Sequence, residues 1–168
     1  MEYSVSTLKT NTIQAATGTT VNVASGQVLN APGHVIQVIQ GVFKTQEVTT
    51  SDSFQTSAIA QAITPSSASS KILITISFVT QVQNTTRGRY TILSSATGAA
   101  LTPSGETSIT AIEAANINQP ITIQHLDSPN TTSAVTYSLQ YRNDTNGNNC
   151  FIMPSDTPGY ITLEEIAQ

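Results

Sequence analysis

Apolar and polar side chains alternate along several short stretches of the chain, and a period of two is typical of β-strands with one buried face. The clearest stretch is KILITISFVTQVQ, residues 71–83. Its apolar face carries Ile72, Ile74, Ile76 and Phe78. SAVTYSLQYR, residues 133–142, alternates in the same way and groups Val135, Tyr137, Leu139 and Tyr141. Both stretches predict strands that bury one face in a common core.

Turn residues separate further stretches of this kind. The other predicted strands lie in HVIQVIQGVFKTQEV from His34, FQTSAIAQAI at 54–63, RGRYTILSS at 87–95, PITIQHL at 120–126 and YITLEEIAQ at 160–168. SITAIEAA, residues 108–115, fits a strand or a short helical turn. Asn146-Gly147 is the strongest hairpin signal, and it predicts a tight turn with NCFIM, residues 149–153, as the return strand. About eight short strands without a convincing amphipathic helix predict an all-β sandwich or jelly roll.

The first 33 residues differ from this pattern, and we assign 1–33 to an attachment arm or stem and 34–168 to the sandwich domain. The arm is rich in Thr, Asn, Ala and Gly, and its apolar residues are sparse: Val5, Leu8, Ile13, Val21, Val23, Val28 and Leu29. In a monomer these side chains would bury little and leave strand edges open. We therefore expect the arm to be stable only against partners, with Pro32-Gly33 as the joint to the domain.

Composition supports an all-β protein with an uncharged polar surface. Only 10% of the 168 residues are charged, against roughly 25% in an average soluble domain. Thr, Ser, Gln and Asn take their place, and the branched Cβ of Thr suits a pleated strand. The net charge is −4 with six basic residues, and Arg87 and Arg89 form the single close pair, which argues against nucleic-acid binding. No long apolar run or signal peptide is evident, so we expect no membrane insertion and synthesis in a reducing cytoplasm.

The residue types that usually carry catalysis lack an activating context. His34 and His125 have no HxH, HExxH or CxxC spacing around them, and a surface or hydrogen-bonded histidine is the expectation for each. Cys150 begins an apolar strand, which favours a buried thiol over a nucleophile. Among the carboxylates, Glu113 lies between Ile112 and Ala114 and is a candidate for a buried, paired role or a polar contact between subunits. We expect no enzyme activity, no metal and no cofactor.

One spacing resembles a metal loop. Asp144, Asn146 and Asn148 form a D-x-N-x-N pattern that is typical of calcium loops. The glycine stands at the fourth loop position instead of the sixth, and Ser155 occupies the twelfth in place of glutamate. The pattern therefore favours the hairpin turn over a calcium site.

Several phrases of the chain resemble tail-fibre and other virion structural proteins of tailed bacteriophages, notably those infecting cyanobacteria and marine bacteria. They are STLKTNTIQAATGTTVNVASGQVLNAPGHVIQVIQG at the start, ITPSSASSKILITISF at 63–78, HLDSPNTTSAVTYSLQYR at 125–142 and ITLEEIA at 161–167. The resemblance spans most of the chain. Its motifs hold no catalytic residues, so it indicates a structural role more firmly than a place in the virion.

The resemblance implies a homotrimer with an N-terminal docking segment and a β-sandwich head similar in outline to tumour-necrosis-factor and C1q heads. A trimer also suits the arm, since three copies can bury Val21, Val23, Val28 and Leu29 on one axis and pair their open edges. The last strand offers candidate trimer-axis contacts in the head: Tyr160, Ile161 and Leu163.

These observations favour a short trimeric tail fibre that contacts the host surface, with partners among other phage virion proteins and host cell-surface polysaccharide. Such a protein would be assembled in the host bacterial cytoplasm and reside in the virion. Amides, hydroxyls and aromatic faces suit neutral sugars, and the available aromatics are Tyr90, Tyr137, Tyr141 and Tyr160. Because the shaft is no longer than residues 1–33, a capsid decoration (cement) protein is the alternative, and a polysaccharide depolymerase is a third.

Overall fold

The structure is a computed structural model that describes residues 31–84, 86–101, 110–112 and 116–168. The chain divides into Met1–Asn30 and Ala31–Gln168, and every described residue lies in the second unit. The seven apolar arm residues and Glu113 lie outside the described residues. Their assigned roles, and the boundary placed at Gly33, therefore stay predictions.

Eleven β-strands and one short 3-10 turn make up the regular structure of the described residues. The strands are β1 (Val35–Phe43), β2 (Glu47–Thr49), β3 (Gln55–Ile63), β4 (Lys71–Val82), β5 (Gly88–Ser94), β6 (Ala99–Leu101), β7 (Thr110–Ile112), β8 (Gln119–Asp127), β9 (Val135–Asn143), β10 (Cys150–Ile152) and β11 (Gly159–Ile166). The turn, η1, spans Pro154–Asp156. Of the stretch 108–115, the described part is strand β7, so the strand interpretation holds there.

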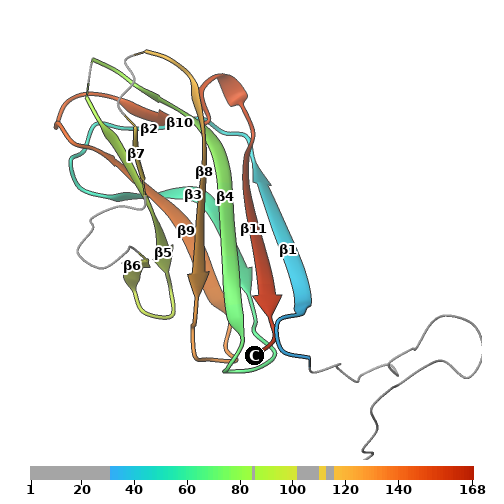
Figure 1. Cartoon of the computed structure of the whole chain (residues 1–168). Helices are drawn as coiled ribbons and strands as arrows, with labels where there is room; N and C mark the ends of the chain where they lie inside the picture. The colour runs from blue at the N-terminus through green and yellow to red at the C-terminus, as the bar shows by residue number, and fades with distance from the viewer. Residues whose placement is uncertain (1–30, 85, 102–109, 113–115) are drawn as a thin grey trace, which may run out of the picture. The chain divides into compact units, whose positions relative to one another are not determined.

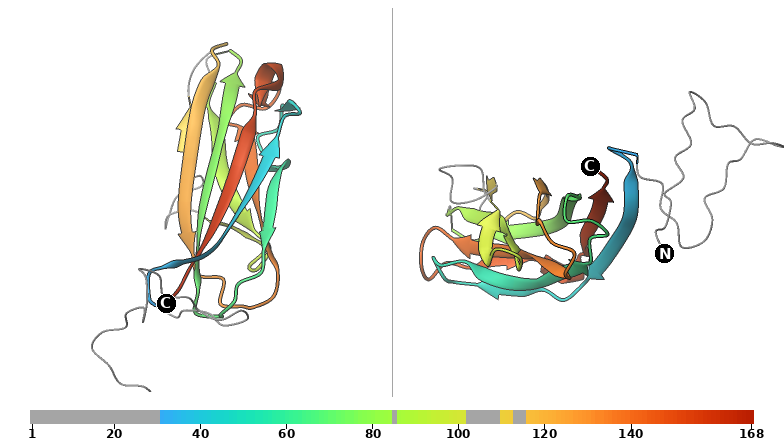
Figure 2. Two further views of the ribbon diagram at one scale, coloured as in Figure 1. Left: turned by 90° about the vertical axis from the view of Figure 1, so that its right-hand side faces the viewer. Right: turned by 90° about the horizontal axis from the view of Figure 1, so that it is seen from below.

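Two antiparallel sheets face each other as a sandwich (Figures 1 and 2). In the first sheet, β4 pairs with β8 along one edge and with β11 and β10 along the other. Strand β1 then pairs with β11, and β2 with β10. In the second sheet the order is β3-β9-β5, and β5 pairs with both β6 and β7. The all-β sandwich predicted from the alternation is confirmed.

The strand pairs are nested along the chain, and this nesting identifies the topology. The first strand pairs with the last, β2 with β10, β3 with β9, β4 with β8, and β5 with β6 and β7. The chain is therefore one long antiparallel hairpin that is rolled up, so that successive pairs come to lie in different sheets. The resulting orders, β1-β11-β4-β8 and β3-β9-β5-β6, are those of a jelly roll.

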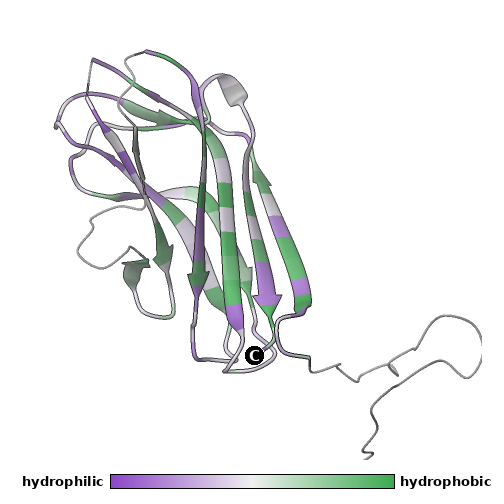
Figure 3. Ribbon diagram, in the orientation of Figure 1, coloured by the Kyte–Doolittle hydropathy of each residue, from purple (hydrophilic) through white to green (hydrophobic). Residues whose placement is uncertain are grey.

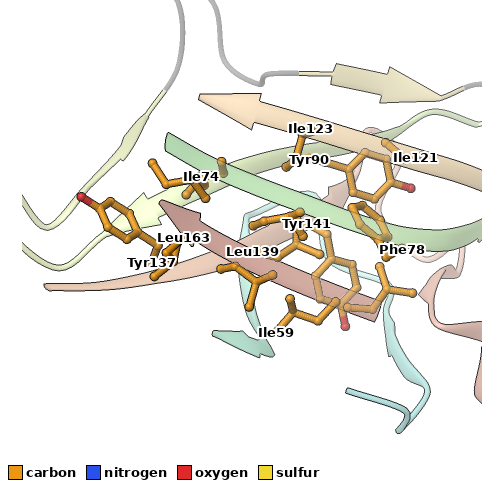
Figure 4. Packing of buried hydrophobic residues seen from close by; sticks show 14 of the residues in the cluster. Ile59, Ile74, Phe78, Tyr90, Ile121, Ile123, Tyr137, Leu139, Tyr141 and Leu163 are labelled. Atoms are coloured by element: carbon orange, nitrogen blue, oxygen red, sulfur yellow. The ribbon is translucent and has the colours of Figure 1, made fainter. Parts of the chain in front are cut away.

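The core lies between the sheets and uses the alternation expected from the sequence (Figure 4). Ile72, Ile74 and Ile76 of β4 are fully buried, as are Tyr137 and Leu139 of β9. Each fully buried side chain of this size contributes about 1.5–3 kcal/mol. Phe78 and Tyr90 pack across the sandwich with ring centroids 5.3 Å apart and a 58° tilt, a favourable edge-on arrangement.

The Asn146-Gly147 prediction is partly wrong. A turn is present, and Gly147 adopts a φ of 91°, which glycine reaches without steric cost. However, β9 belongs to the second sheet and β10 to the first, so the two strands do not form a hairpin. The segment crosses between sheets instead, and the Gly147 N–H donates to the Thr50 carbonyl at 2.9 Å.

Candidate functional site

A buried carboxylate lies near the end of β11. Glu165 is 0% exposed. Its Oε1 accepts hydrogen bonds from the Ser66 N–H at 2.7 Å and the Ser66 hydroxyl at 2.6 Å, and its Oε2 accepts one from the Gln37 amide at 2.6 Å. Burial alone would raise the pKa of this carboxyl, but the hydrogen bonds outweigh that effect and hold its pKa below the usual value. Glu165 thus fastens the β3–β4 connection to β1 and β11 and is a structural anion.

A second carboxylate, Asp144, follows β9 and is held by two guanidinium groups. Its Oδ1 accepts from the Arg89 Nε and lies 3.2 Å from an Arg142 nitrogen. The hydrogen bond from Arg89 is the main cause that lowers the pKa of Asp144. Arg142 also donates to the Asp52 carbonyl at 2.8 Å and stacks over the Phe54 ring. Because Asp144 is neutralised by arginine, the calcium-loop reading of its D-x-N-x-N pattern has no support here.

The thiol and the inner tyrosines belong to the core. Cys150 is buried, as predicted, and burial raises the pKa of its thiol. The Tyr90 hydroxyl lies 3.4 Å from Cys150 Sγ and bonds the Thr80 hydroxyl at 2.5 Å. Burial likewise raises the pKa of Tyr90, Tyr137 and Tyr141. These groups stay protonated at neutral pH and serve as hydrogen-bonding core residues.

Neither histidine joins a cluster of ionisable groups. The His34 Nδ1 contacts the Ala31 backbone, as expected for a hydrogen-bonded histidine, and His125 is half-buried on β8 opposite Ile74. Across the described ranges, no group of three His, Cys, Asp or Glu side chains is placed to hold a metal ion. Within the same ranges, no helix is long and apolar enough to cross a membrane.

Two of the surface hollows are lined by described residues, and both are small. One, of about 220 Å³, is lined by Val42, Phe43, Lys44, Thr45, Ala58 and Met153. The other, of about 180 Å³, is lined mainly by Phe78, Val79, Pro120, Ile121, Pro158 and Tyr160. Both fall below the roughly 300–1,000 Å³ of typical ligand pockets, and neither is lined by a pair of carboxylates.

The most unusual surface is the outer face of the first sheet, which we call the apolar face. It comprises the outward side chains of β1, β2, β4, β8, β10 and β11. Four large side chains on it stand well in solvent: Val38 (59% exposed), Val42 (51%), Leu126 (47%) and Tyr160 (38%). Val48 of β2 is a fifth, at 50%, and Val35 of β1 is a sixth, at 45%. Figure 3 shows apolar and polar residues alternating along β1, β11 and β4; its apolar bands include the residues that face the core.

The candidate trimer-axis residues of the last strand prove to be of two kinds. Ile161 and Leu163 are fully buried within one chain, so the expectation that they contact other subunits is wrong. They point between the sheets, because alternate residues of β11 face opposite sides. Tyr160 points outward onto the apolar face and stays a candidate contact. It is also the one exposed ring of the four aromatics considered for sugar binding, since Tyr90, Tyr137 and Tyr141 are buried.

Sequence reasoning missed the apolar face as a unit. Val38 and Val42 lie in the stretch after His34, whose alternation is incomplete, and Leu126 closes the predicted strand 120–126. Their grouping on one surface could be inferred only by knowing that β1 and β8 belong to the same sheet. The available signal was the valine at every fourth position, 38 and 42, out of phase with Ile39 and Phe43.

Comparison with known proteins adds little. No protein-family model matches the chain, and no curated protein matches it. Among solved structures, the chain is similar to the VP2 protein of Infectious Bursal Disease Virus, studied as a D431N mutant in T=1 particles. The identity is 10%, the TM-score is 0.40, and the match covers 88% of this chain and 40% of that one. A likeness at this level carries no argument about function.

Proposed function

We propose that this chain is a structural subunit of a virus particle, and specifically a short homotrimeric tail fibre of a tailed bacteriophage. The observation that carries the proposal is the apolar face, on which valine, leucine and tyrosine side chains stand in solvent on one sheet. Exposed apolar surface of this kind marks a site of protein association. A jelly roll that associates with other chains is a recurrent solution in virus particles.

The sequence resemblance supports the finer part of the proposal. The phrases that resemble tail-fibre proteins extend from the N-terminal segment to ITLEEIA near the end of the chain. The arm, residues 1–33, would dock on other virion proteins, and three domains would contact host polysaccharide together, so that weak contacts become multivalent. The protein would then reside in the virion after assembly in the host bacterial cytoplasm.

We further propose that the chain is not an enzyme. Glu165 and Asp144 are both committed to hydrogen bonds that keep them ionised, whereas a glycosidase needs one carboxyl group that holds its proton near neutral pH. The Cys150 thiol is buried with a raised pKa, which makes it a poor nucleophile. A depolymerase is tested by incubating purified protein with host envelope and measuring released sugar. Release that one carboxylate substitution abolishes would overturn this part of the proposal.

The place in the virion is tested by immunogold electron microscopy of intact particles with antibody against the purified chain. We expect label at the tail, and competition between purified protein and particles for host cells. Label distributed over the capsid, together with leakage of DNA from heads that lack the protein, would replace the tail fibre with the cement protein. That outcome would keep the structural role and change its location.

A further inference from the structure

The strand register arranges the apolar face into rows that run across four strands. The strands follow the order β1, β11, β4 and β8. The first row is Val42, Tyr160, Ser77 and Thr122. The second row is Gln40, Thr162, Thr75 and Gln124. The third row is Val38, Glu164, Leu73 and Leu126. Residues in one row lie directly opposite one another, so they form one continuous surface.

The middle row is a neutral band of hydrogen-bonded amides and hydroxyls. The Gln40 amide donates to the Thr162 hydroxyl at 3.0 Å, and the Gln124 amide donates to the Thr75 hydroxyl at 3.0 Å. In the first row, the Ser77 and Thr122 hydroxyls lie 2.8 Å apart. Each of these groups keeps donor and acceptor capacity for a further partner. The band can therefore both donate and accept hydrogen bonds, although it carries no charge.

Apolar side chains flank the neutral band. Val38, Val42 and Leu126 are each about half exposed, at 59%, 51% and 47%. Above the first row, Val79, Pro120, Pro158 and Tyr160 line the hollow of about 180 Å³. Among the residues of the three rows, Glu164 is the single side chain that is charged at neutral pH, and the next charged side chain on the face is Lys71, opposite Ile166 beyond the third row. Exposed apolar side chains mark a surface that other molecules cover, and depletion of charged residues is the compositional mark of the central part of an interface.

We propose that the apolar face is the surface through which copies of this chain pack against one another. The inference rests on the proposed function, since it assigns a surface to the assembly invoked there. In this proposal the contacts between copies are made by outward residues on β1, β11, β4 and β8, and not by the buried Ile161 and Leu163.

The charge pattern identifies a second copy as the occupant. A face with almost no charge is not built to select a charged partner, because opposite charges supply much of that selectivity. Because the face carries little charge, the same face of two copies can pack together without the repulsion that two faces of like charge would experience. Amides and hydroxyls pair with their own kind, because each is both donor and acceptor.

The path of the chain supports the same occupant. Thirty residues precede Ala31, and the described chain enters β1, a strand that carries three of the exposed valines. There the Gly33 N–H donates to the Ala167 carbonyl at 2.8 Å, and the Ala167 N–H donates to the His34 carbonyl at 3.0 Å. The entry of β1 is thus tied to the end of β11 within the same sheet. Copies joined through their arms would bring these strands close together.

The test is the oligomeric state of the full-length chain in sedimentation velocity. Val42→Lys and Leu126→Lys each place an ammonium group on the apolar face, where the side chain is exposed in one chain and would be buried between copies. Ala62→Lys is the matched control, because Ala62 is exposed on β3 of the other sheet. We expect the wild type and Ala62→Lys to form the same oligomer, and each apolar-face variant to associate more than about tenfold more weakly, because burying an unpaired charge is costly.

The outcomes separate this inference from the proposed function. A monomeric wild type would overturn both the trimer and the interface. If Val21→Asp or Val23→Asp in the arm dissociates the oligomer while Val42→Lys and Leu126→Lys do not, the trimer stands and the apolar face is not its interface. If the lysine variants stay oligomeric but lose binding to host cells, the face holds a host ligand, which also overturns the inference.

A second measurement does not depend on disrupting the oligomer. Thr162→Cys places a thiol in the middle row, and Ala62→Cys places one on the other sheet. The native Cys150 is buried with a raised thiol pKa, so it gives little background with a short bis-maleimide reagent. We expect covalent dimers from Thr162→Cys and background levels from Ala62→Cys. Equal cross-linking of the two variants, or cross-linking of Ala62→Cys alone, would contradict the proposed interface.

Discussion

On the outer face of the first sheet, valine, leucine and tyrosine side chains stand in solvent, whereas strands β3, β9 and β5 of the second sheet carry mainly alanine, threonine, glutamine and arginine outward, with Leu93 part-buried among them. The exposed large hydrophobic residues that lie on described strands all belong to the first sheet. The inner faces show no such difference, since both sheets supply fully buried side chains to one core. Folding of a single chain therefore accounts for the inner faces and leaves the apolar face to be explained by association.

The two outer faces also differ in the charged residues that they carry. On the second sheet, Arg89 and Arg142 lie directly opposite each other across β5 and β9, and Asp144 offsets their repulsion. On the apolar face, the middle row holds amides and hydroxyls alone. A charged outer face remains hydrated and keeps neighbours away, whereas a neutral one can be dehydrated at low cost.

The largest expected effect tests whether the inner faces are equivalent. Ile74→Ala on β4 and Leu139→Ala on β9 each remove a fully buried side chain, one from each sheet. Both should lower the free energy of unfolding by about 2–5 kcal/mol, through lost burial and the cavity left behind. Urea unfolding monitored by circular dichroism measures both changes. A loss confined to one sheet would show that the core is not shared as described.

The next effect concerns the buried anion of the first sheet. Glu165→Ala leaves the Ser66 N–H and the Gln37 amide without their acceptor and should lower the free energy of unfolding by about 1–3 kcal/mol. The folded-state pKa of Glu165 is depressed, so its contribution is fully present above the unfolded-state pKa and is lost as pH falls through the folded-state pKa. Urea unfolding at pH 7 and at successively lower pH measures this loss.

Glu165→Gln is the matched control for the pH dependence. The amide cannot titrate, so the difference in unfolding free energy between wild type and variant should shrink as the pH is lowered. Asp144 also has a lowered pKa and contributes a dependence of the same sign in both proteins, which the comparison cancels. A difference that stays constant across the acidic range would rule out the assigned role of Glu165.

A smaller effect is expected at the charged cluster of the second sheet. Asp144→Asn leaves Arg89 and Arg142 opposite each other without the carboxylate between them. The pair lies at the surface, so the loss in unfolding free energy should be about 0.2–1 kcal/mol. It should shrink in 1 M salt, where like charges are screened. A loss of equal size at low and high salt would mean that Asp144 acts through its backbone contacts instead.

The smallest effect sharpens the comparison of outer faces most directly. Val38→Thr on the apolar face and Ala62→Thr on β3 should each change the unfolding free energy of a dilute, dissociated chain by less than about 0.5 kcal/mol. At high concentration only Val38→Thr should lower the melting temperature, because association stabilises the folded chain by mass action. Thermal melts over a range of protein concentrations make the measurement. Parallel behaviour of the two variants would remove the distinction between the faces.

Residue alternation in the sequence determined most of the strands and, for the clearest ones, which side faces inward. Ile72, Ile74, Ile76 and Phe78, and the group from Val135 to Tyr141, were assigned to a core from their period of two, and they are buried. This works because a pleated strand points successive side chains to opposite faces, which is a local property of the backbone. The buried thiol of Cys150 followed from its apolar neighbours in the same way.

The pairing between strands could not be predicted from the sequence. The signals at Asn146-Gly147 predicted a hairpin, yet β9 and β10 lie in different sheets. This error concerns contacts between residues far apart in the chain, whose formation depends on loop closure and on the packing of the whole sandwich. The assignment of Ile161 and Leu163 to subunit contacts is a different error, because their alternation with Thr162 and Glu164 is a local pattern that places both on the buried face.

The sequence by itself thus determined an all-β chain with a charge-poor surface and an alternating core. Only the tertiary structure decided that β1, β11, β4 and β8 share one sheet and that their outward residues form one apolar face. The physical reason is that each of these strands carries only a few outward apolar side chains. A few exposed apolar side chains on one strand are common in soluble proteins. They form a continuous surface only because the nested pairing places the four strands side by side.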